Sequence, residues 1–207
     1  MNPPDEIRTI DDFREVTTTI NKSSFIAQVY PLTSEDVFKE HLLNAKKKHY
    51  NASHHCYAYK LINGNFRYSD AGEPNGSAGI RILNAIEHFR LVNQLVIVSR
   101  IFGGVKLGVG PLGKAYYESA YQVLNDSKIS TKSLFQKVEI LSDIEHSSLI
   151  HRILANYQSI VLDTEYQETL KLTCLLRNNE IESISKKISD SGKNKIMLKI
   201  HPEFVYR

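Results

Sequence analysis

The sequence predicts an α+β protein of two domains, an α/β sandwich followed by a smaller domain with the element order βαββαβ. Segments with strand and helix patterns alternate through both halves of the chain. Eight of the ten glycines lie between Gly72 and Gly113, so glycine is confined almost entirely to the first half. A polar, turn-rich segment at 124–133 separates the two halves. We therefore place the domain boundary between residues 131 and 132, giving domains of residues 1–131 and 132–207.

The elements of the first half follow from periodicity and turn residues. Branched apolar residues mark strands, an Asn-Gly pair marks a hairpin, and proline suits a first helical turn. The predicted elements are two strands within 14–31 around a turn at 21–24, a helix at 34–48, strands at 54–61 and 65–68, a helix at 78–89, a buried strand at 94–102, and a helix beginning at 110–111.

The second half contains six short segments with clear patterns. They are strand 135–141, helix 146–157, strands 159–166 and 169–176, helix 180–188 and strand 194–201. This order is that of the ferredoxin-like fold.

Composition excludes several classes of protein. The hydrophobic fraction of 42% and charged fraction of 24% are those of an ordinary globular chain, and the net charge of +3 does not by itself indicate a nucleic-acid partner. Cys56 and Cys174 are far apart and show no CxxC spacing, so we expect neither a disulfide framework nor a zinc site. The beginning of the chain does not resemble a signal peptide, and no apolar run is long enough to cross a membrane. We expect a cytoplasmic protein without metal or cofactor.

One motif resembles a phosphate-binding loop. Residues 108–114 read GVGPLGK and match GxxxxGK after a hydrophobic strand. However, Ala115 lacks the hydroxyl that would hold Mg²⁺, and Pro111 lacks a backbone N–H. These features argue against an ATP or GTP site. A tight structural turn and an anion site at the start of the following helix both remain open.

Four acid–base groups in the first half form a second candidate site. His54, His55, Asp70 and Glu73 could act in a small hydrolase or a phosphate-handling enzyme. Adjacent histidines on a strand point to opposite faces, so only one of the pair can line a given cleft. The segment SDAGEP also reads as a turn in which carboxylates cap backbone donors. Both interpretations of the acidic residues stay open.

Three motifs make the chain resemble the YigZ/IMPACT family. They are HHCYAY at 54–59, RYSDAGEPNGSAG at 67–79 and SRIFGGVKLGVGPLGKAY at 99–116. The resemblance implies an N-terminal domain like ribosomal protein S5 domain 2 and domain IV of elongation factor G. It also implies that the βαββαβ domain resembles domain V of that factor, and it implies a link to translation.

The leading functional hypothesis is therefore a non-catalytic protein that binds RNA or the ribosome, or a protein partner in the translation machinery. It would modulate translation, with a stress response as one setting. Its candidate nucleic-acid or anion-binding residues are Arg100, Gly103, Gly104, Lys106, Gly108, Gly110 and Lys114. We expect the two glycine-rich segments to lie side by side and form one cleft. Asp70 and Glu73 would lie on one wall, with Arg100, Lys106 and Lys114 on the other. The sequence does not indicate an oligomeric state.

Overall fold

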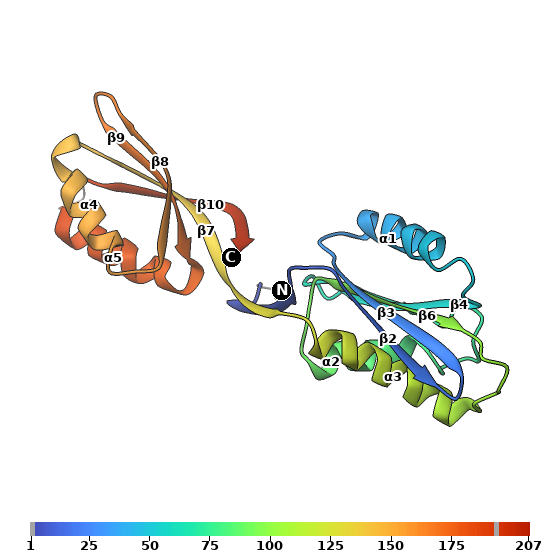
Figure 1. The fold of residues 1–207 in the computed structure, drawn as a ribbon. Coiled ribbons are helices and arrows are strands. Elements are labelled where there is room, and N and C mark those ends of the chain that lie inside the picture. Colours follow the sequence, from blue (N-terminus) through green and yellow to red (C-terminus); the bar gives the residue numbers. More distant parts are fainter. Residues whose placement is uncertain (1–2, 193–194) are drawn as a thin grey trace. The chain divides into compact units, whose positions relative to one another are not determined.

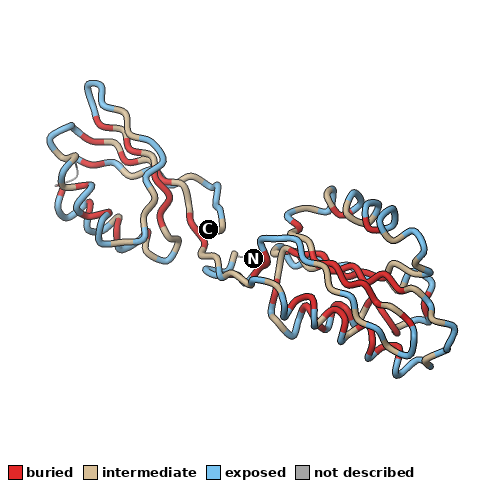
Figure 2. The backbone as a smooth tube through the Cα atoms, in the orientation of Figure 1, coloured by how far each residue is buried: buried red, intermediate tan, exposed pale blue. Residues whose placement is uncertain are grey.

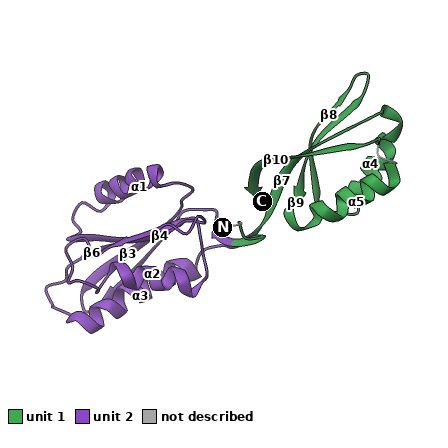
Figure 3. Cartoon of the chain, turned by 180° about the vertical axis from the view of Figure 1, so that it is seen from behind, with its two compact units in different colours: residues 1–7, 132–207 green, residues 8–131 purple. Residues whose placement is uncertain are grey.

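The computed structural model describes residues 3–192 and 195–207, and Figure 1 labels its helices and strands. The chain forms two compact units (Figure 3). Residues 8–131 make up the N-terminal unit, and residues 1–7 with 132–207 make up the C-terminal unit. The chain thus passes between the units twice, after Ile7 and after Thr131.

Residues 3–7 join the C-terminal unit through specific hydrogen bonds, although the sequence analysis grouped them with the first domain. The Leu134 amide donates to the Asp5 carbonyl over 2.7 Å, and the Tyr206 hydroxyl donates to the Pro4 carbonyl over 2.7 Å. Glu6 forms an ion pair with Arg177. These residues lead into strand β1 (Glu6–Ile10), which the sequence analysis did not predict. A strand of five residues in a charged segment gives too weak a pattern to be recognised.

The N-terminal unit is a sheet covered by helices on both faces. Its further elements are β2 (Arg14–Ile20), β3 (Ser23–Pro31), α1 (Glu35–Lys48), β4 (His54–Lys60), β5 (Phe66–Ser69), α2 (Gly79–His88), β6 (Gln94–Ile101) and α3 (Val109–Asn125). Five strands form an antiparallel sheet in the order β2-β3-β6-β4-β5. Figure 1 shows α2 and α3 on one face of this sheet and α1 on the other.

Two apolar clusters hold these layers together. Residues of β3, β4 and β6 that face α2 and α3 form the larger cluster. The residues between them along the β4 and β6 strands face the opposite side of the sheet and pack beneath α1. Figure 2 shows buried residues along the central strands and the inward sides of α2 and α3. β6 is buried along almost its whole length, because both faces of a central strand are covered. Among the described residues, no helix has the length and apolar composition needed to cross a bilayer.

The C-terminal unit has the predicted ferredoxin-like element order. Its elements are β7 (Ile129–Ser142), a 3₁₀ turn at Ile144–His146, α4 (Ser147–Leu154), β8 (Ser159–Tyr166), β9 (Leu170–Arg177), a 3₁₀ turn at Asn178–Glu180, α5 (Ile181–Gly192) and β10 (Met197–Tyr206). The strands pair antiparallel in the order β10-β7-β9-β8, and β1 also pairs with β7. The α+β fold class is confirmed.

Two predicted boundaries differ from the observed ones. Residues 129–133, which we read as part of a polar linker, are the first residues of β7. The last predicted strand began at residue 194, which lies outside the described residues, and the observed strand begins at Met197. Polar strand ends carry no apolar alternation, so composition alone reads them as loop.

The turn between β2 and β3 constrains the glycine-rich loop after β6. Asn21 and Lys22 both have positive φ, as a two-residue hairpin turn requires. Gly103 lies directly against this turn, and a Cβ atom at Gly103 would come within 2.0 Å of the Lys22 carbonyl oxygen. The Gly103 amide also donates to the Ser23 hydroxyl over 3.1 Å. Gly103 is therefore required by close backbone contact.

We expect Gly103→Ala to lower the free energy of unfolding by about 3 kcal/mol, because the hairpin must shift to admit a methyl group. Gly110→Ala is the matched control, since a Cβ atom there meets nothing within 4 Å. Alanine in that helical turn should be neutral or stabilising by about 0.5–1 kcal/mol. Urea unfolding of both variants measures the difference, and equal stabilities would contradict this account of Gly103.

Candidate functional site

Three cross-strand neighbours establish the site on the face of the sheet that α2 and α3 cover. Arg100 lies near the end of β6, where it pairs with Phe25 of β3 on one side and His54 of β4 on the other. Directly opposed residues of adjacent strands share a face. The register therefore brings Phe25, Arg100 and His54 into one row.

Glu73, in the turn before α2, forms a buried ion pair with Arg100. The Arg100 Nη1 lies 2.8 and 3.2 Å from the two carboxylate oxygens of Glu73. The side chains of Arg100 and Glu73 are only 7% and 4% exposed. The Tyr116 hydroxyl of α3 donates a further hydrogen bond to Glu73 over 2.8 Å. Charges removed from water are tolerated only with such additional hydrogen bonds.

The guanidinium of Arg100 is held between two aromatic rings but keeps unused donors. Its Cζ lies 5.5 Å from the ring centre of Phe25 and 5.4 Å from that of Phe102. Nη2 reaches the Ser23 hydroxyl only over 3.5 Å. Nε is buried and has no hydrogen-bond partner among the described residues. A buried donor without a partner is costly, so it calls for an explanation.

His54 is oriented by the turn that carries Glu73. Its Nδ1 lies 2.9 Å from the Ala71 carbonyl oxygen, and because a carbonyl only accepts, Nδ1 must donate. Its Nε2 then lies 3.9 Å from Oε2 of Glu73. In the neutral ring, Nε2 is therefore a hydrogen-bond acceptor.

Asp70 has a structural position at the start of α2. One carboxylate oxygen accepts from the amides of Ala78 and Gly79 over 2.9 and 2.8 Å, and the other accepts from Gly76 over 2.9 Å. Asp70 thus caps the helix with a negative charge at the positive end of its dipole. The capping interpretation of the SDAGEP turn holds for Asp70.

His55 lies on the opposite face of the sheet, as expected for adjacent residues of a strand. Its Nδ1 is 2.8 Å from the Ser99 hydroxyl, and burial, followed by the nearby charge of Lys46, lowers its pKa. Of the four predicted acid–base residues, only His54 and Glu73 therefore face each other, and the alternative catalytic group of four is not assembled.

A cavity of about 400 Å³ opens beside Arg100; we call it the Arg100 cavity. It joins the two glycine-rich segments, with Glu73 on one and Lys106 on the other, whereas Asp70, which we expected on the same wall as Glu73, does not line it. Its lining residues are His54, Glu73, Pro74, Arg100, Phe102, Lys106, Leu107, Gly108, Val109 and Leu112.

Lys114 lies on the other side of α3, in a second hollow of about 400 Å³ that we call the Arg81 hollow. It is lined by Arg81, Asn84, Gly110, Gly113, Lys114 and Tyr117. The prediction that Lys114 shares a wall with Lys106 is therefore wrong. Leu112 and Lys114 are two residues apart, and at 3.6 residues per turn they project on roughly opposite sides of a helix.

The glycines of the predicted binding set have separate positions. Gly108 precedes α3 with φ of 79° and lines the Arg100 cavity, whereas Gly110 lies within the first helical turn and lines the Arg81 hollow. Gly103 packs against the β2–β3 hairpin, and Gly104 has a φ of 85°. The GxxxxGK match is therefore mostly helix, unlike a phosphate-binding loop. Whether these glycines bind an anion stays a prediction.

Sequence reasoning missed Tyr116, Phe102 and Arg81. Tyr116 lies on the apolar face of α3, and a buried tyrosine hydroxyl normally needs a polar partner, which was a usable signal. Phe102 lies within the glycine-rich motif, but the sequence does not indicate that this aromatic residue is 46% exposed. Arg81 reaches the Gly76 carbonyl from the first turn of α2, a contact that no sequence spacing predicts.

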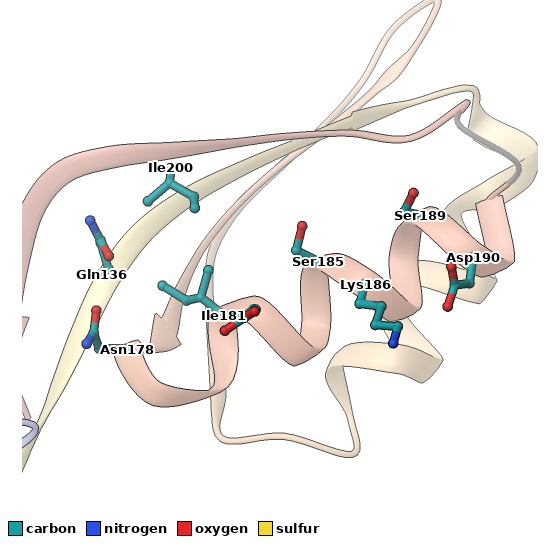
Figure 4. Close-up of a pocket in the computed structure, with 9 residues that line it drawn as sticks. Gln136, Asn178, Ile181, Ser185, Lys186, Ser189, Asp190 and Ile200 are labelled. Atoms are coloured by element: carbon teal, nitrogen blue, oxygen red, sulfur yellow. The ribbon is translucent and has the colours of Figure 1, made fainter.

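The C-terminal unit has its own hollow of about 610 Å³. Figure 4 shows it between α5, which contributes Ser185 and Ser189, and the strands that carry Gln136 and Ile200. Its charged lining residues are Glu182, Lys186 and Asp190. Because these charges have mixed sign, the hollow does not favour an anion.

We expect Asp70→Ala to lower the free energy of unfolding by about 1–3 kcal/mol, because three backbone amides lose their acceptor. Asp126→Ala is the control, since the Asp126 carboxylate accepts only exposed side-chain hydrogen bonds. Chemical denaturation measures both variants. A loss for Asp126→Ala as large as that for Asp70→Ala would contradict the capping role.

We expect both thiols to be inert in the folded protein at pH 8. Burial raises the pKa of Cys56 and of Cys174 to about 12, so the reactive thiolate is scarce at that pH. A thiol-specific disulfide reagent should therefore titrate two thiols in 6 M guanidinium and react with them far more slowly under native conditions. Rapid reaction under native conditions would show that the two thiols are accessible to solvent, which contradicts their buried positions.

Comparison with known proteins identifies relatives of this chain. Residues 21–124 match the Impact N-terminal domain. The chain is 29% identical over 192 residues to the IMPACT family member YvyE of Bacillus subtilis, covering 91% of this chain and 88% of that protein. It is 33% identical over 109 residues to Protein IMPACT of Oryctolagus cuniculus, covering 50% of this chain and 34% of that protein.

A crystal structure of a hypothetical protein has the same fold, with a TM-score of 0.66 and 23% sequence identity, covering 97% of this chain and all of that one. The family match spans half of the chain and contains the Arg100 cavity and the Arg81 hollow. The chain belongs to the IMPACT family.

Proposed function

We propose that this chain is a non-catalytic RNA-binding protein that acts on the ribosome and modulates translation, with its binding surface around the start of α3. One observation carries the proposal: cationic hollows lie on both sides of that helix start. Arg100 and Lys106 line one hollow, and Arg81 and Lys114 line the other. Among the described residues that line the two hollows, Glu73 is the one acidic residue, and it is paired with Arg100; Lys114 also lies 3.5 Å from the exposed carboxylate of Glu118.

The helix start adds to this charge. The first amides of a helix lack intrahelical acceptors, and the helix dipole is positive at this end. Phosphate groups bind at such positions, where backbone donors and lysine or arginine side chains act together. Lys106, Arg81 and Lys114 are exposed and therefore accessible to a polyanion.

The acid–base residues favour binding over catalysis. Both oxygens of Asp70 accept backbone hydrogen bonds, and Glu73 is held by Arg100 and Tyr116. A general base needs a free lone pair within reach of substrate. Glu73 is held by three donor contacts, and only His54 Nε2 faces it without a hydrogen bond, so the pair supports an RNA-binding role better than hydrolysis.

We expect Lys106→Ala with Lys114→Ala to weaken co-sedimentation with ribosomal subunits and binding to single-stranded RNA. Each lost phosphate contact should reduce the slope of log affinity against log salt by about 0.7, so the double variant should lose about 1.4. The measurement is binding across a salt series.

The matched control is Lys39→Ala with Lys47→Ala, which removes the same charge from exposed positions on α1. This control should leave the slope close to that of the parent protein. An unchanged slope in the Lys106/Lys114 variant, or an equal loss in both variants, would rule out the α3 surface as the site.

A further inference from the structure

We propose that the Arg100 cavity binds a single nucleotide, with its phosphate at Lys106 and the first turn of α3 and its base against Phe102. The nucleotide can be a free mononucleotide or one unstacked residue of single-stranded RNA, and only the second form rests on the proposed function. The cavity volume of about 400 Å³ lies within the range of small-molecule sites, roughly 300–1,000 Å³.

Unused donors mark the phosphate end of the cavity. The Nη1 of Arg100 donates to Glu73, and Nη2 makes only the long contact to Ser23. The buried Nε has no partner among the described residues. A guanidinium with free donors is suited to oxyanions of phosphate. Lys106 and the amide end of α3 at Val109 line the same cavity. Lys106 and the helix start therefore supply the positive potential there, because Glu73 offsets the charge of Arg100.

Phe102 marks the base end. Its ring lies over the Arg100 guanidinium, yet the residue is 46% exposed. An exposed ring beside an arginine is a platform on which a nucleic-acid base can stack, and this stacking contributes about 1–3 kcal/mol per base. Leu107, Val109 and Leu112 provide apolar walls for the remainder of the base and sugar.

Acceptors inside the cavity distinguish a nucleotide from an aliphatic acid. His54 Nε2 can accept a hydrogen bond, and Oε2 of Glu73 lies 3.9 Å from it. An alkyl chain in this position would leave His54 Nε2 without a donor, which is unfavourable. A base with ring N–H or exocyclic amino groups provides those donors. The cavity therefore matches a ligand that brings an anion to Lys106 and the first turn of α3 and hydrogen-bond donors to His54.

The test is titration of the full chain, by calorimetry and by amide NMR shifts, with AMP, GMP, CMP and UMP as separate probes. Inorganic phosphate and hexanoate are the comparison ligands. We expect at least one mononucleotide to bind more tightly than both comparison ligands. Phe102→Ala should weaken that binding about 5- to 150-fold, the range that stacking energies give.

Lys106→Ala should also weaken mononucleotide binding, whereas Lys47→Ala is the matched control and should leave it within about twofold, because Lys47 is an exposed lysine of α1 that lines neither hollow. Phe102 and Lys106 are both exposed, so neither variant should unfold, and thermal melting verifies this. Equal binding of phosphate or hexanoate, no mononucleotide binding at millimolar concentration, or unchanged affinity in Phe102→Ala would overturn the inference.

Competition experiments distinguish a free mononucleotide from one residue of single-stranded RNA as the ligand of the cavity. If a hexaribonucleotide displaces the bound mononucleotide and loses affinity in Phe102→Ala, the RNA form is supported. If mononucleotides bind but RNA and ribosomes do not, the proposed function fails and the cavity is a site for free nucleotides. If RNA binds with the expected salt slope but no mononucleotide does, the proposed function stands and the nucleotide cavity is refuted.

Discussion

The buried ion pair between Glu73 and Arg100 is the interaction on which the rest of the site depends. It joins the turn before α2 to the central strand β6, and the Tyr116 hydroxyl ties α3 to the same carboxylate. Burial raises the pKa of Tyr116, so its hydroxyl stays protonated and remains a donor. Removing either charge would leave the other uncompensated in a medium of low polarity. The back wall of the Arg100 cavity is consequently fixed.

The outer part of the site is built on different principles. Phe102, Val105 and Val109 are large apolar residues that remain substantially exposed on the loop and helix start after β6. Gly103 anchors the beginning of this loop to the β2–β3 hairpin, while Gly104 and Gly108 adopt positive φ. A rigid charged interior thus stands beside an accessible rim of aromatic, apolar and cationic groups. Such a combination is suited to recognition, because ligand contacts can form without reorganisation of the core.

The sequence predicted most elements and the meeting of the two glycine-rich segments, because turn residues and apolar periodicity are local signals. It could not decide which carboxylate faces inward: Asp70 and Glu73 lie in the same turn, and only the fold assigns one to capping and the other to Arg100. Nor could it separate Lys106 from Lys114, because that depends on the rotation of α3. The inclusion of residues 3–7 in the C-terminal unit depends on contacts across almost the whole chain, which no local pattern contains.

The double passage of the chain between the units has a consequence for the order of folding during synthesis. Residues 8–131 can assemble as soon as they leave the ribosome, but the first residues must wait for partners such as Leu134 and Tyr206. At about 5–20 residues per second, residues 132–207 take roughly 4–15 s to be made. During that interval residues 4–6 lack the partners that hold them in the folded unit. During synthesis the N-terminal unit can therefore fold several seconds before the C-terminal unit is able to form.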